Sequence, residues 1–285
     1  MGRVWYRGPM IEDGRARKMQ TRIRNKIKGA IGRLAALSGV VTQRYRSKLI
    51  IVAFHRVNDA LPEDGLTHGS EKFEQYCEFF RRNFRIVPVS EQIAGCNSGN
   101  DVGGTLSITF DDGYRDNYEV AAPILRRLNL PATFFITTGF IGSQTIAPWD
   151  HDLVRQPGWM DWEQVRSLIS QGFEIGCHTA SHIDLGTADD GTTRLELETS
   201  KRKLHEELGR PVLLFAYPFG GQKNMCERSL KLVREAGFIC CLSCFGGVNT
   251  SKVSPFELKR IPIARGFGDP DQFGFDLVFG RVAQV

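Results

Sequence analysis

The spacing of apolar residues divides the chain into two parts. Apolar side chains recur at helical spacing over residues 19–37, whereas from residue 49 short apolar runs alternate with amphipathic segments. The first pattern predicts a long amphipathic helix. The second is typical of a mainly parallel sheet with helices packed outside it. We therefore expect an N-terminal helical arm over residues 1–47 and an α/β domain over residues 48–285.

The alternation is regular enough to predict individual elements. Strands are expected over residues 49–54, 85–89, 105–110, 131–137, 173–177, 212–216 and 238–243. Helices are expected over residues 90–94, 118–128, 161–171, 192–208 and 227–236, and one more begins at Ser70. Functional sites of parallel α/β folds lie at the carboxyl ends of the strands, so polar residues at those positions are the candidates.

Charge is distributed unevenly between the two parts. Residues 1–48 carry 13 Lys or Arg against two acids, which leaves the remaining chain with an excess of six acids despite the overall charge of +5. An acidic body argues against nucleic acid as a partner. The arm combines apolar and basic residues over positions 19–41. Such a helix could lie on an anionic membrane surface or could brace the domain, and amphipathicity alone does not choose between the two.

The sequence also bears on location and cysteine chemistry. No apolar run is long enough to span a bilayer. The short apolar stretch at residues 30–41 is interrupted by Arg33 and lacks a convincing cleavage site. We therefore expect a monomer in the cytoplasm or bound peripherally at the inner face of a membrane.

Cys241 and Cys244 have CxxC spacing, but no second pair completes a zinc site, which favours a structural role.

Two acids follow the predicted strand at residues 105–110. Asp111 and Asp112 come directly after it, and Gly113 permits a sharp exit of the chain. Adjacent carboxylates at a strand end are unfavourable unless positive charge lies near them. Taken alone, the Asp-Asp-Gly sequence is more typical of a solvated turn than of a functional site.

Two histidines follow a later predicted strand, at residues 173–177. His178 and His182 are four residues apart, so in a helical turn they would share one face. Two imidazoles and one carboxylate form the three-ligand set of many catalytic zinc sites. The conjunction of both motifs at strand ends indicates a metal site.

These segments resemble a known enzyme family. Residues 109–114 (Thr-Phe-Asp-Asp-Gly-Tyr) are similar to the first motif of the polysaccharide deacetylases, carbohydrate esterase family 4. Residues 172–182 resemble the second motif, and residues 215–220 (Phe-Ala-Tyr-Pro-Phe-Gly) resemble the third. The resemblance extends from about residue 48 to about residue 275. It implies a distorted, incomplete (β/α) barrel of about seven parallel strands that removes N-acetyl groups from N-acetylhexosamine units of a glycan, in the synthesis of an exopolysaccharide, capsule or glycolipid.

The resemblance also implies roles for individual residues. Asp111 would be the general base, and Asp112, His178 and His182 would hold a divalent metal, with Zn²⁺ favoured over Co²⁺ or Ni²⁺. The backbone N–H of Phe219 would stabilise an oxyanion. Further candidates are Tyr217 and Trp149 for substrate binding and Asp184 for orienting a ligand histidine.

The chain departs from the family pattern at two positions: the histidine that commonly serves as the general acid and the arginine that commonly contacts the general base. Residues 258–264 contain no histidine, so the usual late Leu-x-His motif is missing. Residues 52–57 (Val-Ala-Phe-His-Arg-Val) instead resemble rearranged members, including poly-N-acetylglucosamine deacetylases, whose histidine motif comes first. We therefore expect His55 to be the acid. Ala216 stands where an arginine commonly contacts the base, and Arg260 is a candidate replacement.

Two other functions remain open from the residues alone. A glycosidase would use Asp111 with a second carboxylate and no metal, and the paired histidines argue against it. A glycan-binding protein without activity is supported only by the missing arginine, whereas the presence of both acids and both histidines argues against it.

Overall fold

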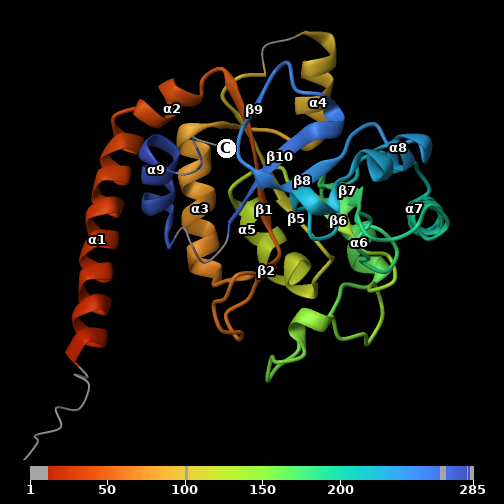
Figure 1. The fold of residues 1–285 in the computed structure, drawn as a ribbon, viewed down its shortest axis with the longest axis horizontal. Coiled ribbons are helices and arrows are strands. Elements are labelled where there is room, and N and C mark those ends of the chain that lie inside the picture. The colour runs from red at the N-terminus through yellow and green to blue at the C-terminus, as the bar shows by residue number, and fades with distance from the viewer. Residues whose placement is uncertain (1–11, 100–101, 264–267, 281, 283–285) are drawn as a thin grey trace, which may run out of the picture.

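A parallel sheet forms the centre of the fold in the computed structural model, which describes residues 12–99, 102–263, 268–280 and 282 (Figure 1). The strand order is β7-β6-β5-β1-β10-β8, with β4 pairing with β5 and β9 with β1. Their bounds are β1 Lys48–Phe54, β4 Arg85–Ile86, β5 Thr105–Phe110, β6 Thr133–Ile136, β7 Glu174–Cys177, β8 Leu242–Gly246, β9 Asn249–Thr250 and β10 Leu258–Pro262. Among the described residues only β9 runs antiparallel, so the prediction of about seven parallel strands is confirmed.

The sheet curves towards a barrel but does not close through a regular strand. Phe215 and Ala216 lie between the edge strands and make single parallel bridges to Cys177 of β7 and Leu242 of β8. The strand expected over residues 212–216 is thus reduced to these bridges. Prolines at 211 and 218 bound this segment and cannot donate backbone hydrogen bonds, which shortens the pairing.

Other strands also differ from their predictions. β4 ends at Ile86 rather than at residue 89, and no strand was predicted for the segment that forms β10. β8 begins at Leu242 rather than at residue 238, because the preceding N–H groups bond elsewhere, Ile239 to Leu213 and Cys241 to Pro255. Cys241 is nevertheless buried, and its thiol donates to the Phe256 carbonyl oxygen over 2.9 Å, as suits a structural cysteine.

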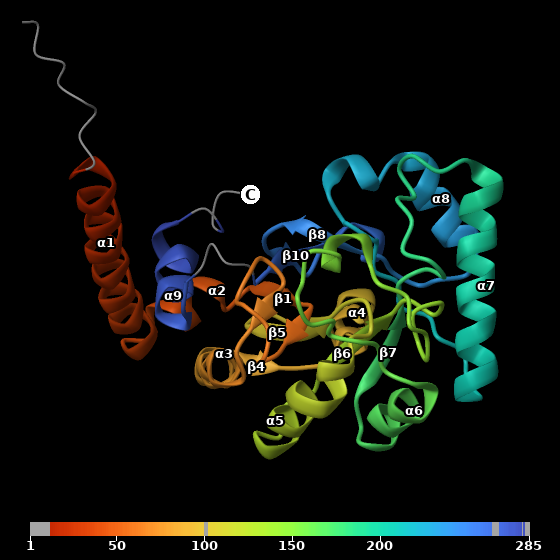
Figure 2. The same cartoon turned by 90° about the horizontal axis from the view of Figure 1, so that it is seen from below.

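Helices cover the outside of the sheet (Figures 1 and 2). Asp161 caps α6 with a reciprocal pair of hydrogen bonds to Gln164, as its position in the sequence predicts. The helix expected over residues 118–128 begins as a π-helical turn, Asn117–Ala121, and continues as α5. The helices are α3 Ser70–Asn83, α4 Val89–Ser98, α5 Ala122–Arg127, α6 Trp162–Ser170, α7 Asp190–Leu208 and α8 Glu227–Glu235; β2 Arg56–Val57 and β3 Thr67–His68 form a small second sheet.

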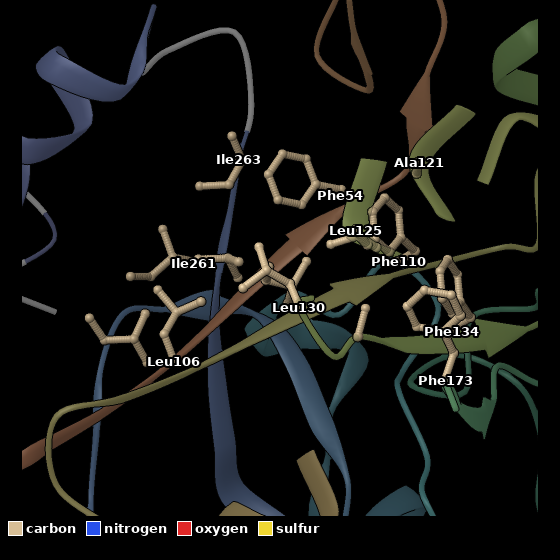
Figure 3. Packing of buried hydrophobic residues seen from close by; sticks show 14 of the residues in the cluster. Phe54, Leu106, Phe110, Ala121, Leu125, Leu130, Phe134, Phe173, Ile261 and Ile263 are labelled. Atoms are coloured by element: carbon tan, nitrogen blue, oxygen red, sulfur yellow. The ribbon is translucent and has the colours of Figure 1, made fainter. Parts of the chain in front are cut away.

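An aromatic core fixes the carboxyl ends of the central strands. Phe54, Phe110 and Phe134 stack from three neighbouring strands, with ring centroids 5.7 and 4.9 Å apart, and Phe173 packs edge-on against Phe134 (Figure 3). Phe54 and Phe110 are the last residues of β1 and β5. The residues that follow them therefore leave the sheet from rigid neighbouring positions.

The N-terminal arm is helical and packs against the end of the chain. α1 (Glu12–Leu37) lies on the outside of the molecule against α9 (Pro270–Phe279), and the short α2 (Val40–Tyr45) leads into β1 (Figures 1 and 2). The arm therefore does brace the domain, one of the two roles left open by its sequence. Residues 1–11 lie outside the described part of the chain. None of the helices described combines the length and apolarity that crossing a bilayer requires.

Candidate active site

A pocket of about 330 Å³ lies at the carboxyl ends of the central strands. It is lined by all five polar residues predicted to carry chemistry: His55 after β1, Asp111 and Asp112 after β5, and His178 and His182 after β7. Trp149, Tyr217 and Phe219 also line it, as expected for substrate contacts. The sequence did not indicate the remaining lining residues, which are Gly65, Leu66, Cys244, Pro262 and Ile263.

Asp112, His178 and His182 form a group with the composition of a metal site. One ligand atom from each lies within 4.8 Å of the others. Nε2 of His178 and Nε2 of His182 are 3.4 and 3.3 Å from Asp112 Oδ1, which is buried and has no hydrogen-bond partner among the described residues. Burial raises the pKa of Asp112, but the two imidazoles hold it well below its usual value. Three ligand atoms that lie close together and form no hydrogen bonds with one another are suited to binding a divalent cation.

A loop, and not a helical turn, brings the two histidines together. Thr179 and His182 adopt left-handed backbone angles, with φ of 67° and 59°, so the chain doubles back between the imidazoles. The two histidines therefore meet without the helical turn that was the predicted condition for their sharing one face. Left-handed angles strain a β-branched residue such as Thr179 and persist where surrounding contacts enforce them.

Hydrogen bonds to other parts of the chain hold this loop. Nδ1 of His178 lies 2.8 Å from the carbonyl oxygen of Ala216, which leaves Nε2 for a metal. On α7, the carboxylate of Glu196 accepts hydrogen bonds from the N–H groups of Ala180 and Ser181 and from the Ser181 hydroxyl. Backbone N–H groups that would otherwise lack partners are thus tied to a rigid helix.

Asp184 does not orient a ligand histidine. Its carboxylate accepts a hydrogen bond from the N–H of Gly186 over 2.9 Å and closes its own turn. Nδ1 of His182 has no hydrogen-bond partner within the described residues. The expectation for Asp184 was therefore wrong, because an aspartate two residues before a free N–H readily forms a local turn.

Aromatic rings, rather than the carboxylate of Asp184, pack against the imidazole of His182. The rings of Trp149 and Phe219 lie 4.5 and 4.8 Å from its imidazole, measured between centroids. The indole N–H of Trp149 donates to the Tyr114 hydroxyl over 2.7 Å. Trp149 is thus part of the support of His182 as well as of the pocket wall. The hydroxyl of Tyr217 contacts Ser229, so only its ring is available to the pocket.

Asp111 is bound by the arginine that the sequence offered as a candidate. Nη1 and Nη2 of Arg260 lie 2.7 Å from Oδ1 and Oδ2 of Asp111, and both side chains are buried. Nη1 also donates to Thr109, and Nε donates to the Ser243 carbonyl oxygen. Burial raises the pKa of Asp111, but Arg260 and His178 outweigh that effect and bring it below its usual value.

Small residues leave room for this arginine to cross the inside of the barrel. Arg260 is on β10 and Asp111 follows β5, so the guanidinium must pass β1, which lies between them. Ala53 of β1 pairs with Thr109 on one side and Pro262 on the other. Side-chain alternation places Ala53 on the same face as Ile51, which is in one buried cluster with Ala216. Ala53 and Ala216 are thus small residues on the face of the sheet that Arg260 crosses, and Ala216 is also the position where the family commonly has its arginine.

Replacing Arg260 by methionine is expected to lower the free energy of unfolding by about 3–5 kcal/mol, because the Asp111 carboxylate is left buried without its counter-charge. In an Asp111→Asn background, replacing Arg260 by methionine should lower the free energy of unfolding by a clearly smaller amount. Urea unfolding of the four proteins in this cycle measures the difference. An equal cost in both backgrounds would show that the ion pair does not account for the effect.

His55 lies at the end of β1 and faces the same pocket. Its carbonyl oxygen accepts a hydrogen bond from the Asn117 side chain over 2.7 Å, which anchors the strand end. Burial lowers the pKa of its imidazole, and the carboxylates of Asp112 and Asp111 oppose that shift.

A second buried arginine organises the rim of the pocket, and no sequence pattern pointed to it. Arg56 is fully buried and donates to Asp150 and, over 2.8 Å, to Asp64. Asp150 in turn accepts a hydrogen bond from Tyr114, the partner of Trp149. The loop that carries Leu66 and the turn that carries Trp149 are thus joined through one guanidinium.

Comparison with known proteins identifies the family. The polysaccharide deacetylase family model matches residues 98–240. The putative polysaccharide deacetylase YxkH of Bacillus subtilis (strain 168) is 23% identical over 222 residues, which is 77% of this chain and 73% of that protein. The poly-β-1,6-N-acetyl-D-glucosamine N-deacetylase of Staphylococcus aureus (strain MSSA476) is 27% identical over 166 residues, 55% of this chain, and the match spans about half of that relative, 53%.

The fold has solved counterparts. The deacetylase PplD of Streptococcus pyogenes, solved in complex with acetate, superposes with a TM-score of 0.68 at 21% identity, covering 79% of this chain and 96% of that one. The matched family segment spans half of the chain and contains Asp111, Asp112, His178 and His182. The chain therefore belongs to the polysaccharide deacetylase family of hydrolases.

Proposed function

We propose that this protein removes N-acetyl groups from N-acetylhexosamine units of a polysaccharide or glycoconjugate. The observation that carries the proposal is the convergence of an arginine-bound carboxylate, Asp111, with the group of Asp112, His178 and His182 in one pocket. An N-deacetylase among the relatives favours an amide over an ester as the bond that is cleaved.

Asp112, His178 and His182 would hold a divalent cation, which when bound polarises the acetamide carbonyl and lowers the pKa of a water molecule. Two imidazoles and one carboxylate favour Zn²⁺, and Co²⁺ and Ni²⁺ accept the same ligands.

The protein's own groups would move the protons. Asp111 is kept ionised by Arg260 and retains free lone pairs on both oxygens, so it can accept a proton from the attacking water. His55 would donate a proton to the nitrogen of the leaving amine. The N–H of Phe219 makes no hydrogen bond within the described residues and would donate to the developing oxyanion.

The remaining wall suits the substrate. Leu66, Pro262 and Ile263 give one side of the pocket an apolar surface on which an acetyl methyl group can pack. Trp149 and Phe219 offer aromatic faces at the rim, and sugar rings stack on such faces.

The test is release of acetate and amine from a panel of N-acetylated glycans, with and without a chelator. We expect acetate and free amine in equal amounts, loss of activity with the chelator, and recovery with Zn²⁺, Co²⁺ or Ni²⁺. New reducing ends that are insensitive to the chelator would instead indicate a glycosidase. Glycan binding without bound metal or acetate release would indicate an inactive member of the fold.

His55→Ala is expected to lower kcat by about 10²–10⁴-fold and to alter the basic limb of the pH–rate profile. Only the imidazolium can donate a proton, so the rate of the unmodified protein should fall as the pH rises through the pKa of His55. Because burial lowers that pKa, the fall should begin below the pH typical of an exposed histidine. An unchanged profile in the variant would exclude His55 as the acid.

Arg56→Met is expected to raise KM for the glycan by roughly tenfold with metal content unchanged, because the rim loops lose their common anchor. Steady-state kinetics and metal analysis check this prediction. Arg81→Met is the matched control, since Arg81 forms an ion pair with Glu78 on an exposed helix face away from the pocket. Equal KM values for both variants would contradict a role for Arg56 at the rim.

A further inference from the structure

α1 packs against α9 through its smallest side chains. Gly29, Gly32, Ala35 and Ala36 are the buried residues of this helix in the described part of the chain. A Cβ atom added at Gly32 would lie 1.8 Å from the carbonyl oxygen of Asp271, so only glycine permits so close an approach. The docked face of α1 therefore contains none of its large apolar residues.

Those large apolar residues form a stripe on the opposite face. Met19, Ile23, Ile27, Ile31 and Leu34 follow one another at intervals of three or four residues and are 65, 50, 56, 39 and 67% exposed. With 100° of rotation per residue, this stripe points away from the glycine face by about half a turn. A contiguous exposed apolar patch of this kind marks an interaction surface.

The charged residues that α1 itself places beside the stripe are all basic. Arg22, Lys26 and Arg33 are exposed along one border of it. The chain contains no Asp or Glu between Asp13 and Asp59. An apolar stripe bordered by cations is complementary to an anionic lipid surface, where the aliphatic side chains enter the interface and the cations meet the headgroups. A second copy fits less well, since a symmetric contact would bring like charges together.

We propose that the outer face of α1 binds the surface of an anionic lipid bilayer, with the helix lying in the plane of the interface and α9 linking it to the domain. The small-residue face and the apolar face then have separate partners. The helix can remain docked on α9 while it is bound to lipid, so the pocket stays assembled at the membrane.

Vesicle co-sedimentation of the full chain tests the proposal. We expect binding to vesicles of phosphatidylcholine and phosphatidylglycerol in equal amounts, weaker binding at high salt, and little binding to phosphatidylcholine alone. Leu34→Glu should weaken binding by roughly tenfold or more. Leu195→Glu is the matched control, because Leu195 lies on α7 and is 65% exposed, as Leu34 is 67% exposed.

Several outcomes would overturn the proposal. They are absence of binding to the anionic vesicles, equal binding to neutral vesicles, or equal loss in the Leu34→Glu and Leu195→Glu variants. A dimer that dissociates in Leu34→Glu, detected by sedimentation velocity, would assign the stripe to self-association instead. Ile27→Ser provides a second variant if Leu34→Glu proves misfolded by circular dichroism. Deacetylation of a soluble glycan should be unchanged in these variants, which separates this test from that of the proposed function.

Discussion

Asp111→Asn is expected to lower kcat on an N-acetylated glycan by roughly 10²–10⁴-fold while the protein keeps its metal. Asparagine has nearly the same shape as aspartate but cannot accept a proton from water at neutral pH. Asp112, His178 and His182 are unchanged, so the metal ligands remain. The effect should therefore appear in turnover and not in metal content.

Acetate release under saturating glycan, together with metal analysis of the same preparation, measures both quantities. Asp152→Asn is the control, because Asp152 is an exposed carboxylate outside the pocket lining. The Asp111→Asn change also leaves Arg260 with fewer acceptors, so urea unfolding must show that the variant is folded under assay conditions. Normal deacetylation by Asp111→Asn would remove Asp111 from the role of base.

His178→Ala is expected to lose the metal, and with it all deacetylation. His178 supplies one of three ligand atoms, and the contact of its Nδ1 with the Ala216 carbonyl oxygen directs Nε2 towards the other two. The loss of metal affinity should exceed the roughly 10–100-fold that follows removal of a group that merely orients a ligand. Competition with a chromogenic zinc chelator measures this affinity.

His205→Ala serves as the control for that experiment. His205 is exposed on α7 and lies outside the pocket lining, so this variant should keep both metal and activity. Glu196→Ala is a useful intermediate case, because it loosens the loop of His178 and His182 without removing a ligand. If His178→Ala bound metal as tightly as the unmodified protein, the proposed ligand set would be wrong.

Backbone strain is concentrated at the site. Five non-glycine residues among those described have positive φ, and four of them are Asp112, Thr179, His182 and Phe219. Each belongs to one of the three motifs that resemble the family. Left-handed angles cost free energy that the surrounding packing must offset, which is typical of positions where side-chain direction matters more than local stability.

The sequence by itself determined the elements and the chemical groups of the site. Apolar periodicity placed β5 at Thr105–Phe110, as the structure has it, and placed most other strands and helices within a few residues. These features depend on neighbours in the chain, because strand and helix periodicity and capping are local. Asp111 and His178 could be selected for the same reason, since each directly follows a strand.

Tertiary structure alone decided which distant residues meet. The contact between Arg260 and Asp111 joins positions 149 residues apart and depends on β1 lying between β5 and β10. The packing of Trp149 on His182, and the anchoring of the rim by Arg56, depend likewise on how separate loops fold over the sheet. Helical periodicity identified the two faces of α1, but only packing showed that the glycine face, rather than the apolar one, is docked. The physical reason is that periodicity fixes the direction of a side chain relative to its own element, whereas strand order, register and close backbone approach fix what it meets.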